Sequence, residues 1–426
     1  MTIHTVAEGE TLTSIAREYG VSPSLIQELN QLSDPSSLIT GQALVILYPE
    51  TVHTVESGET LSGIAGEYGV SVIQLLQRNP DLSGLSNIYP GQTLVISYQS
   101  PPDVRITTTG YAYTYISDAV LRRTLPYLTY LSVFSYGLRP DGSLIEPQDD
   151  QRLIDLAREY GAVPLLMLTS LNEGGTFSSE LINSILASEA LQDAVIENVI
   201  SVVQAKGYGG VEADFEYIDG QYREEYASFV AKLNGALGDG YTVMTDLAPK
   251  TSRDQPGLLY EAHDYRALGE ASDLVFLMTY EWGYQYGPPM AVSPINNVRR
   301  VIEFALTDIP DYKILTGVPS YGYDWTLPFI RGESSAESLS YRRALELARN
   351  VGAEIQFSTE DAAPYFEYTD DGGRQHIVWF QDARSSEAIL KLVQEYSLEG
   401  AGVWNIMRWY PQVWTVMIGM FEISKI

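Results

Sequence analysis

Short apolar runs alternate with amphipathic stretches over most of the chain. The runs occupy residues 104–113, 129–136, 163–170, 209–216, 241–249, 273–280, 312–320 and 401–407, and they are rich in Val, Ile, Leu and Tyr. Between them, apolar residues recur at helical spacing, as at 151–160, 188–207, 223–238, 296–307 and 386–397. Eight strands that alternate with helices over about 320 residues predict an α/β fold, a (β/α)8 TIM barrel. Catalytic residues would then lie at the C-terminal ends of the strands.

The stretch at 321–384 is too long for one strand–helix unit. It contains a helical pattern at 340–352, followed by a hairpin pattern at 365–380 in which Asp-Asp-Gly-Gly is a strong turn signal. We therefore expect a small α+β insertion between the seventh and eighth strands.

Two copies of one unit precede the barrel, because residues 3–48 and 52–98 match at an offset of 49. Each copy predicts a short strand, a Gly-Glu-Thr turn, two short helices and a closing strand. Thr11 and Thr60 stand at a helix N-cap position, and Ser14 replaces the acid that would complete a capping box in the first copy. The predicted domains are residues 2–48 and 51–98, a short polar linker at 99–104, and the barrel at 105–426.

The charge balance narrows the range of partners. Lys and Arg number 26 against 55 Asp and Glu, so the net charge of −29 repels nucleic acid and anionic membranes but not a neutral polymer. Cysteine is absent, no apolar run is long enough to span a membrane, and the N-terminal segment lacks the features of a secretory signal. We expect no cofactor. We also expect no metal site, because the four histidines lie far apart in sequence: His4, His53, His263 and His376.

Three acids alternate along the fourth predicted strand, Glu212, Asp214 and Glu216. In a strand, residues i, i+2 and i+4 share one face with neighbours roughly 6–7 Å apart, so these carboxyls would project together into the barrel. Burial and mutual repulsion raise the pKa of carboxyl groups, so at least one of the three would be protonated near neutrality and could act as a general acid. A solvated strand edge is the alternative.

The two N-terminal units resemble the LysM domain, which binds N-acetylglucosamine polymers such as peptidoglycan and chitin. The resemblance rests on HTVAEGETL at 4–12, on HTVESGETL at 53–61, and on the Gly-Gln turn before each closing strand. It implies a shallow groove between the first and last loops of each unit, weakened in the first copy because Thr40 stands where the second has Pro90. The implied groove residues are Gly9, Glu10, Thr11, Leu12, Asn30 and Ile39, with Gly58, Glu59, Thr60, Leu61, Asn79 and Ile88 in the second unit.

The fourth strand resembles the signature D-G-x-D-x-D-x-E of glycoside hydrolase family 18. Gly210, Asp214 and Glu216 match it, whereas Gly209 and Glu212 stand where the family usually has Asp. MTYEWG at 278–283 and GVWNI at 402–406 are similar to motifs of the sixth and eighth strands. LAPK at 247–250, GVPSYGYDW at 317–325 and the end of the insertion resemble a narrower group, the bacterial spore-cortex-lytic N-acetylglucosaminidases, which also carry two N-terminal LysM units.

The family resemblance implies a substrate-assisted mechanism, in which the 2-acetamido carbonyl of the substrate replaces an enzyme nucleophile. Glu216 would donate the proton, Asp214 would orient the acetamide, and Glu212 would share a proton with Asp214. Tyr280 would donate a hydrogen bond to the acetamide oxygen, and Trp404 would form the floor beneath the sugar. The further sugar-contacting candidates are Glu281, Tyr321, Asp324 and Met278, with Asn172 and Glu173 as weaker ones.

The resemblance thus implies a retaining glycosidase that cleaves β-1,4 bonds after N-acetylglucosamine in peptidoglycan of the spore cortex. The LysM units would anchor it to the glycan, at the spore coat or cortex surface. Two alternatives stay open: a chitinase that acts on chitin or chito-oligosaccharides, and a sugar-binding barrel without catalysis.

Overall fold

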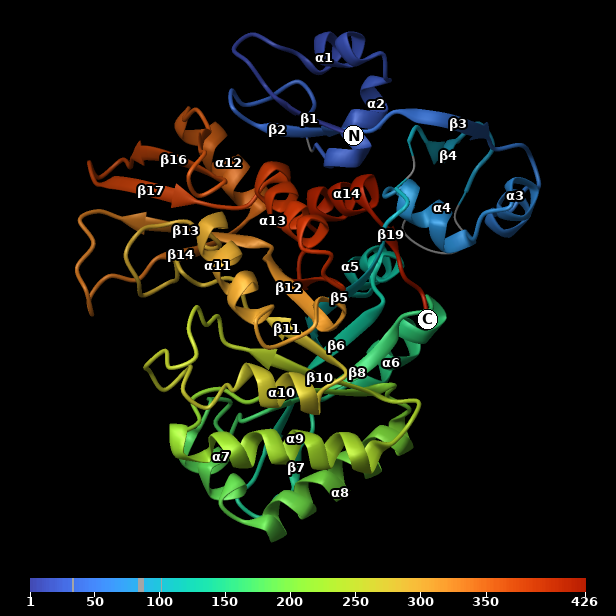
Figure 1. The fold of residues 1–426 in the computed structure, drawn as a ribbon. Coiled ribbons are helices and arrows are strands. Elements are labelled where there is room, and N and C mark those ends of the chain that lie inside the picture. Colours follow the sequence, from blue (N-terminus) through green and yellow to red (C-terminus); the bar gives the residue numbers. More distant parts are fainter. Residues whose placement is uncertain (33, 83–87, 101) are drawn as a thin grey trace.

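The two repeats lie together at one end of the molecule, and the barrel occupies the rest (Figure 1). The structure is a computed structural model that describes residues 1–32, 34–82, 88–100 and 102–426. The strands of each repeat pair antiparallel, and the predicted βααβ order is confirmed. The first repeat contains β1 (Thr2–Thr5), α1 (Leu12–Tyr19), α2 (Pro23–Asn30) and β2 (Ala43–Ile46). The second contains β3 (Pro49–Thr54), α3 (Leu61–Tyr68), α4 (Val72–Arg78) and β4 (Thr93–Tyr98).

The first helix of each repeat begins after a threonine N-cap. Thr11 Oγ1 accepts a hydrogen bond from the Ser14 N–H at 3.1 Å, and Thr60 Oγ1 accepts one from the Gly63 N–H at 3.1 Å. The expectation that the first copy lacks a full capping box is wrong, because the Ser14 hydroxyl accepts the return bond from the Thr11 N–H at 2.9 Å. A serine hydroxyl therefore closes the box here without an acid, whereas Gly63 has no side chain to do so.

Eight parallel strands form the predicted barrel. β18 pairs with β5, and β5 pairs with β6, so the sheet closes on itself. The strands are β5 (Arg105–Tyr113), β6 (Tyr130–Leu138), β8 (Val163–Thr169), β9 (Gly210–Asp214), β10 (Thr242–Leu247), β11 (Leu274–Leu277), β12 (Ile314–Pro319) and β18 (Gly400–Trp404). Two short strands, β7 (Leu144–Ile145) and β19 (Glu422–Ile423), pair with β6 and β5 outside this ring.

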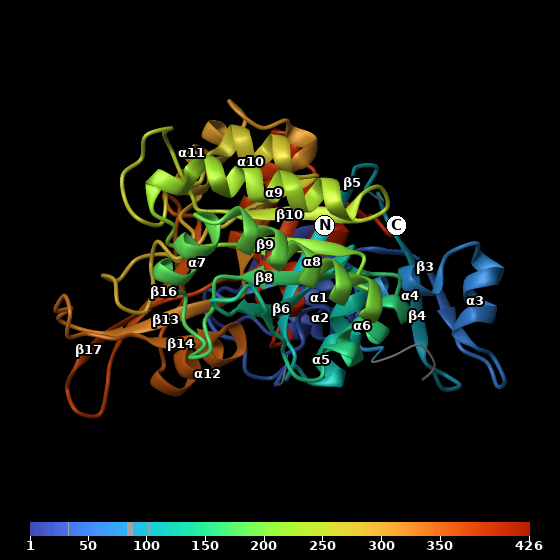
Figure 2. The same cartoon turned by 90° about the horizontal axis from the view of Figure 1, so that it is seen from below.

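Helices surround the strands, as Figure 2 shows from below. They are α5 (Asp118–Thr124), α6 (Asp150–Glu159), α7 (Ser179–Leu186), α8 (Glu189–Lys206), α9 (Arg223–Leu237), α10 (Tyr265–Ala271), α11 (Ile295–Ala305), α13 (Ala383–Glu395) and α14 (Pro411–Met420). Because strand residues alternate between two faces, Val211, Ala213 and Phe215 join the apolar layer between strands and helices. The barrel interior holds a separate apolar cluster that includes Leu165, Met167, Met244, Phe276 and Leu315.

The predicted α+β insertion between the seventh and eighth strands is confirmed. It forms a five-stranded antiparallel sheet in the order β14-β13-β17-β16-β15, with one helix. The elements are β13 (Tyr321–Thr326), β14 (Glu337–Ser340), α12 (Tyr341–Val351), β15 (Gln356–Ser358), β16 (Ala363–Thr369) and β17 (Gln375–Trp379). In the hairpin turn, the Asp370 carboxylate accepts the N–H groups of Gly372 and Arg374, both at 2.9 Å.

Both repeats are docked on the barrel through buried polar contacts. Gln412 on α14 donates hydrogen bonds to Asn30 Oδ1 at 3.0 Å and to the Ala43 carbonyl at 2.8 Å in the first repeat. The Tyr127 hydroxyl of the barrel donates to the Gln77 carbonyl of the second repeat at 2.9 Å. Because these groups are buried, their hydrogen bonds fix the repeats at defined positions on the barrel.

Candidate active site

The three alternating acids lie at the C-terminal end of β9. Glu212 and Asp214 belong to the strand, and Glu216 follows its last residue by two positions. Asp214 and Glu216 line a cavity of about 560 Å³, whereas Glu212 lies deeper in the barrel and is fully buried. The alternation thus brings one carboxyl into the barrel core and two to the cavity wall.

Two neighbouring hydroxyl groups hold Glu212 by hydrogen bonds. The Tyr111 hydroxyl donates to Glu212 Oε1 at 2.7 Å, and the Ser132 hydroxyl donates to Oε2. Burial raises the pKa of Glu212, and these hydrogen bonds oppose the rise. The expected proton sharing between Glu212 and Asp214 stays a prediction, and burial, together with the charge of Glu212, raises the pKa of both Asp214 and Asp246. Asp246 lies near both of these acids because β10 is the strand next to β9.

Asp246 is a carboxyl group of the site that our sequence prediction missed. It is 2% exposed and lines the cavity with Asp214 and Glu216. Its pKa is raised well above the usual range by burial and by the charges of Glu212 and Asp214. A signal was present, because Asp246 is an acid within an apolar strand pattern at 241–249. Four neighbouring buried carboxyls cannot all be ionised, so the group retains protons near neutral pH.

The two carboxyls at the cavity wall are suited to hold and accept protons. Burial raises the pKa of Glu216 to about 7. The pKa of Asp214 is raised well above its usual range by burial and by the charges of Glu216 and Glu212. Asp214 Oδ1 is buried and accepts no hydrogen bond from the residues that the structure describes. This oxygen is therefore available to a donor that a ligand brings into the cavity.

Stacked aromatic rings form another part of the cavity wall. Tyr280 and Trp404 both line the cavity, with ring centroids 6.5 Å apart and ring planes 15° from parallel. Gly317 on β12 makes room for Tyr280, because a Cβ there would lie 2.6 Å from the tyrosine ring. Trp404 also packs against Tyr111 at 5.5 Å and Phe134 at 5.4 Å. Rings held in this way provide a rigid apolar surface on which a sugar ring can stack.

Met278 and Glu281 follow β11 and line the cavity, where they were expected. Glu281 accepts hydrogen bonds from the hydroxyls of Tyr321 and Tyr323, the second at 3.0 Å. Tyr321 is not among the residues that line this cavity. It acts on the site by holding the Glu281 carboxylate in place.

Besides Tyr321, three expected sugar-contacting residues lie outside the cavity lining. Asp324 accepts a hydrogen bond from the Tyr368 hydroxyl at 2.6 Å and contacts His376 Nδ1 at 2.9 Å, within the insertion sheet. Asn172 and Glu173 make their hydrogen bonds at the surface, away from the cavity. These three residues were predicted because each follows the end of a strand in sequence. That position does not determine the direction in which the following loop turns.

Several aromatic residues at the cavity were not predicted individually. Tyr217 and Tyr284 expose 40% and 41% of their surface, so ring faces are accessible to a ligand. The only sequence signal was the abundance of tyrosine, 30 residues in all. The unpredicted aromatic lining residues are Tyr113, Phe134, Phe177, Tyr217, Tyr260, Trp282 and Tyr284.

Two kinds of feature are absent from the described ranges. In these ranges, no group of three or more His, Asp or Glu side chains is arranged to hold a metal ion. Within the same ranges, no helix combines the length and apolar character needed to cross a membrane.

Many of the predicted groove residues in the two repeats hold the fold of each unit. Glu10 and Glu59 each accept the backbone N–H three residues earlier, at 2.7 and 2.6 Å, and each pairs with the histidine six residues earlier at 2.8 Å. Asn30 and Asn79 are buried, and each bridges helix and strand through two carbonyls and one backbone N–H. Leu12, Leu61 and Ile39 are buried, Ile88 is half-buried, and Gly9, Gly58, Thr11 and Thr60 are exposed.

The groove regions of the two repeats differ in their surroundings. In the first repeat, the Thr40 carbonyl accepts the Ile355 N–H of the insertion at 3.0 Å, and a Cβ on Gly41 would lie 1.8 Å from the Ile355 oxygen. At the equivalent Gly91 of the second repeat, a Cβ would meet no described atom within 4 Å. The insertion therefore covers one edge of the first groove, while among the described residues nothing covers the corresponding edge at Gly91 of the second.

Known families and proteins match this chain over both the repeats and the barrel. Residues 113–408 match the model of glycosyl hydrolases family 18, and residues 4–47 and 53–97 match the LysM domain. The cortical fragment-lytic enzyme of Bacillus subtilis (strain 168) is 37% identical over 434 residues, covering 100% of this chain and 99% of that protein. The crystal structure of the Bacillus cereus spore cortex-lytic enzyme SleL matches with a TM-score of 0.84 at 35% identity, covering 100% of this chain and 98% of that chain.

A chitinase from Chromobacterium violaceum ATCC 12472 shares the barrel fold, with a TM-score of 0.68 at 22% identity over 73% of this chain and 97% of that chain. The family model spans the barrel from its first strand to the loop after its last, and the similarity to the Bacillus enzymes continues through both repeats. The chain therefore belongs to glycosyl hydrolases family 18 and is a glycosidase with two N-terminal LysM domains.

Proposed function

We propose that the protein is a retaining, substrate-assisted N-acetylglucosaminidase that cleaves β-1,4 bonds after N-acetylglucosamine in peptidoglycan. One observation carries the proposal: Glu216, with its pKa raised to about 7, shares a cavity with Asp214, whose buried Oδ1 accepts no hydrogen bond from the described residues. A 2-acetamido sugar needs both a general acid and an acceptor for its amide N–H.

In the first step, Glu216 gives its proton to the glycosidic oxygen as the bond from that oxygen to the anomeric carbon breaks. The acetamide carbonyl oxygen of the same sugar bonds to the anomeric carbon from the opposite face, forming an oxazolinium ion. Asp214 accepts the acetamide N–H and stabilises the developing positive charge. Tyr280 donates its hydroxyl to the acetamide oxygen, and Trp404 supports the sugar ring.

In the second step, a water molecule attacks the anomeric carbon and opens the oxazolinium ring. Glu216, now a carboxylate, takes a proton from that water and regains its initial state. Two inversions at one carbon leave the product with the β configuration of the substrate. Asp246 and Glu212 act beneath the site, where their shared protons limit the negative charge around Asp214.

We propose peptidoglycan as the substrate because the chain is similar over its whole length to proteins named for the cortex. The Bacillus proteins named for the spore cortex are 35–37% identical over 99% or more of this chain, which supports cortex peptidoglycan as substrate and the spore as site of action. LysM domains favour an anchor on the same polymer, and the open groove edge of the second domain supports such binding. Anchoring would raise the effective concentration of the barrel at an insoluble substrate.

Product analysis tests the proposal. The purified chain is incubated with cortex peptidoglycan fragments and, separately, with chitohexaose, and the products are identified by mass spectrometry after borohydride reduction. We expect new reducing ends of N-acetylglucosamine from the cortex fragments, with the β anomer formed first in NMR spectra. Turnover of chitohexaose alone would instead identify a chitinase, and an α anomer formed first would exclude the substrate-assisted mechanism.

A further inference from the structure

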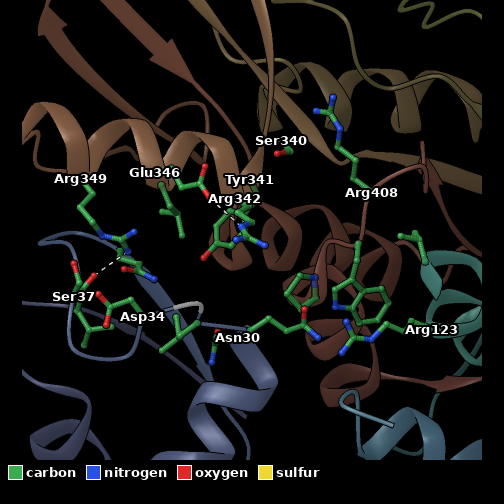
Figure 3. Close-up of a pocket in the computed structure, with 18 of the residues that line it drawn as sticks. Asn30, Asp34, Ser37, Arg123, Ser340, Tyr341, Arg342, Glu346, Arg349 and Arg408 are labelled. Carbon is green, nitrogen blue, oxygen red and sulfur yellow. Dashed lines mark hydrogen bonds and ion pairs between the residues drawn. The ribbon is translucent and has the colours of Figure 1, made fainter. Parts of the chain in front are cut away.

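A second cavity, of about 380 Å³, lies where the first LysM domain meets the barrel (Figure 3). Its walls come from segments far apart in sequence: the loop after α2, helix α5, helix α12 of the insertion, and the loop between β18 and α14. It shares no lining residue with the catalytic cavity. Only the docked arrangement of repeat and barrel creates it.

Four arginines line this cavity, Arg123, Arg342, Arg349 and Arg408. Figure 3 shows Arg342 and Arg349 extending from one helix and Arg123 lying across from them. The cluster stands out in a chain that has only 26 Lys and Arg against 55 acids. The lining includes two acids, Asp34 and Glu346, so arginines outnumber acids there, in contrast to the chain as a whole. We refer to this space as the arginine-lined cavity.

The walls of the arginine-lined cavity also contain hydrogen-bond donors without acceptors. Arg123 Nε, Arg349 Nε, Gln31 Nε2 and Trp409 Nε1 are buried and find no partner among the described residues. All four residues line the cavity. Each of these atoms can only donate, and a buried donor without an acceptor is unfavourable. A ligand rich in acceptor atoms, above all a carboxylate, would match this surface.

A third hollow, of about 430 Å³, adjoins both cavities along the barrel rim. It shares Tyr113 with the catalytic cavity, and it shares Ser340, Met407 and Arg408 with the arginine-lined cavity. Tyr115 lines this hollow, is 77% exposed, and stacks on Tyr113 with ring centroids 5.4 Å apart. An exposed aromatic face suits a sugar ring. The third hollow therefore neighbours both the catalytic cavity and the arginine-lined cavity.

We propose that the arginine-lined cavity is a second substrate site, which binds a carboxylate-bearing substituent of the glycan whose N-acetylglucosamine lies in the catalytic cavity. The inference rests on the proposed function and deepens it. Peptidoglycan carries peptide substituents with carboxylates, and chitin carries none, so this site distinguishes the two polymers. Arg342 and Arg408 are exposed, and Arg342 Nε is paired with Glu346 at 3.0 Å. The other N–H groups of Arg342 and the guanidinium of Arg408 can form charge-assisted hydrogen bonds with carboxylate oxygens.

The test uses the full chain and two forms of one peptidoglycan fragment, with its peptide carboxylates either free or converted to amides. For the unchanged chain, we expect a lower KM for the free-carboxylate form at similar kcat. In an Arg342→Gln/Arg408→Gln double variant, we expect KM for that form to rise about three- to tenfold and the preference to disappear. If the ratio of the two KM values is the same in the double variant as in the unchanged chain, the proposal is wrong.

Arg343→Gln is the matched control, because Arg343 follows Arg342 on α12 but lines none of the three hollows. This variant should keep the original ratio of KM values. If it loses the preference for the free-carboxylate form, the preference comes from a long-range charge effect and the proposed site is wrong.

Calorimetric titration of both fragments into Glu216→Gln, with and without the two arginine substitutions, repeats the comparison without turnover. A carboxylate preference that needs Arg342 and Arg408 supports the site even if neither fragment is cleaved, and equal binding of both forms contradicts it.

Discussion

At the residue scale, the proposed chemistry depends on the proton that Glu216 holds. Its pKa is raised to about 7 by burial, and the protonated form is the one that can act as general acid. We therefore expect kcat/KM to fall as pH rises through about 7 and to continue falling above it. Initial rates on a soluble fragment over a range of pH check this. A profile that stays level through pH 9 would assign the acid role to another group.

Replacing Glu216 by glutamine removes the proton while keeping the shape of the side chain. We expect kcat to drop by about 10²- to 10⁴-fold with little change in fragment binding, because general acid catalysis is lost and the cavity is retained. The same variant should be more stable than the parent above pH 7, since a carboxyl with a raised folded-state pKa loses stability as pH rises. Stopped assays and thermal melts at pH 6 and pH 8 measure both effects.

Glu173→Gln is the control for this variant, since Glu173 is 72% exposed and lies outside the cavity lining. It should leave both kcat and the melting temperature nearly unchanged. An equal loss of kcat in the two variants would mean that the effect comes from net charge and not from the position of Glu216.

The alternating acids were predictable from sequence because strand alternation is a local property. Their partners were less predictable. Asp246 comes near Glu212 and Asp214 only because β10 lies beside β9, and pairing between strands depends on the whole barrel. Asp246 also stands within an apolar strand pattern. That pattern identifies it as a residue of the site only once the order of the strands in the barrel is known.

At the element scale, the barrel strands and the insertion followed from their apolar and turn patterns. The loops after the strands did not, as Asp324 shows: it follows the seventh strand as predicted but turns into the insertion sheet, where Tyr368 and His376 hold it. Loop direction depends on tertiary contacts, so a position near a strand end is a weak predictor of contact with substrate.

Gly317 on strand β12 leaves room for the Tyr280 ring, and a substitution there tests whether β12 positions that ring. In Gly317→Ala, the new Cβ would lie 2.6 Å from the Tyr280 ring, so the ring must shift within a packed barrel. We expect kcat/KM to fall about tenfold or more, because displacement of a positioning group weakens transition-state contacts. Steady-state kinetics on a soluble fragment measure the change.

Gly235→Ala on helix α9 is the matched substitution, because a Cβ there meets no described atom within 4 Å. It should stabilise the fold by about 0.5–1 kcal/mol, since alanine favours a helix over glycine, and should leave kcat/KM unchanged. Equal kinetics in the two variants would show that the Tyr280 ring is not held by β12.

At the scale of the whole molecule, the two LysM domains have different relations to the barrel although their sequences repeat. The first is held by Gln412 of α14 and by Arg384, which donates to the Gly41 carbonyl at 3.1 Å. Its groove edge also meets the insertion at Ile355. The repeat pattern predicted only a first groove weakened at Thr40, and it could not show this difference in docking, because the contacts come from residues more than 300 positions away in sequence.

The paired glycines of the two repeats test whether the first domain is a fixed part of the catalytic unit. Gly41 and Gly91 have φ angles of 83° and 87°, so alanine brings a similar left-handed strain at both positions. In Gly41→Ala the added Cβ would also lie 1.8 Å from the Ile355 oxygen, whereas in Gly91→Ala it meets no described atom within 4 Å. We therefore expect Gly41→Ala to lower the melting temperature more than Gly91→Ala and to speed proteolysis between repeats and barrel. Equal melting temperatures would show that the first domain moves independently, and the arginine-lined cavity, which needs the docked arrangement, would then lose one wall.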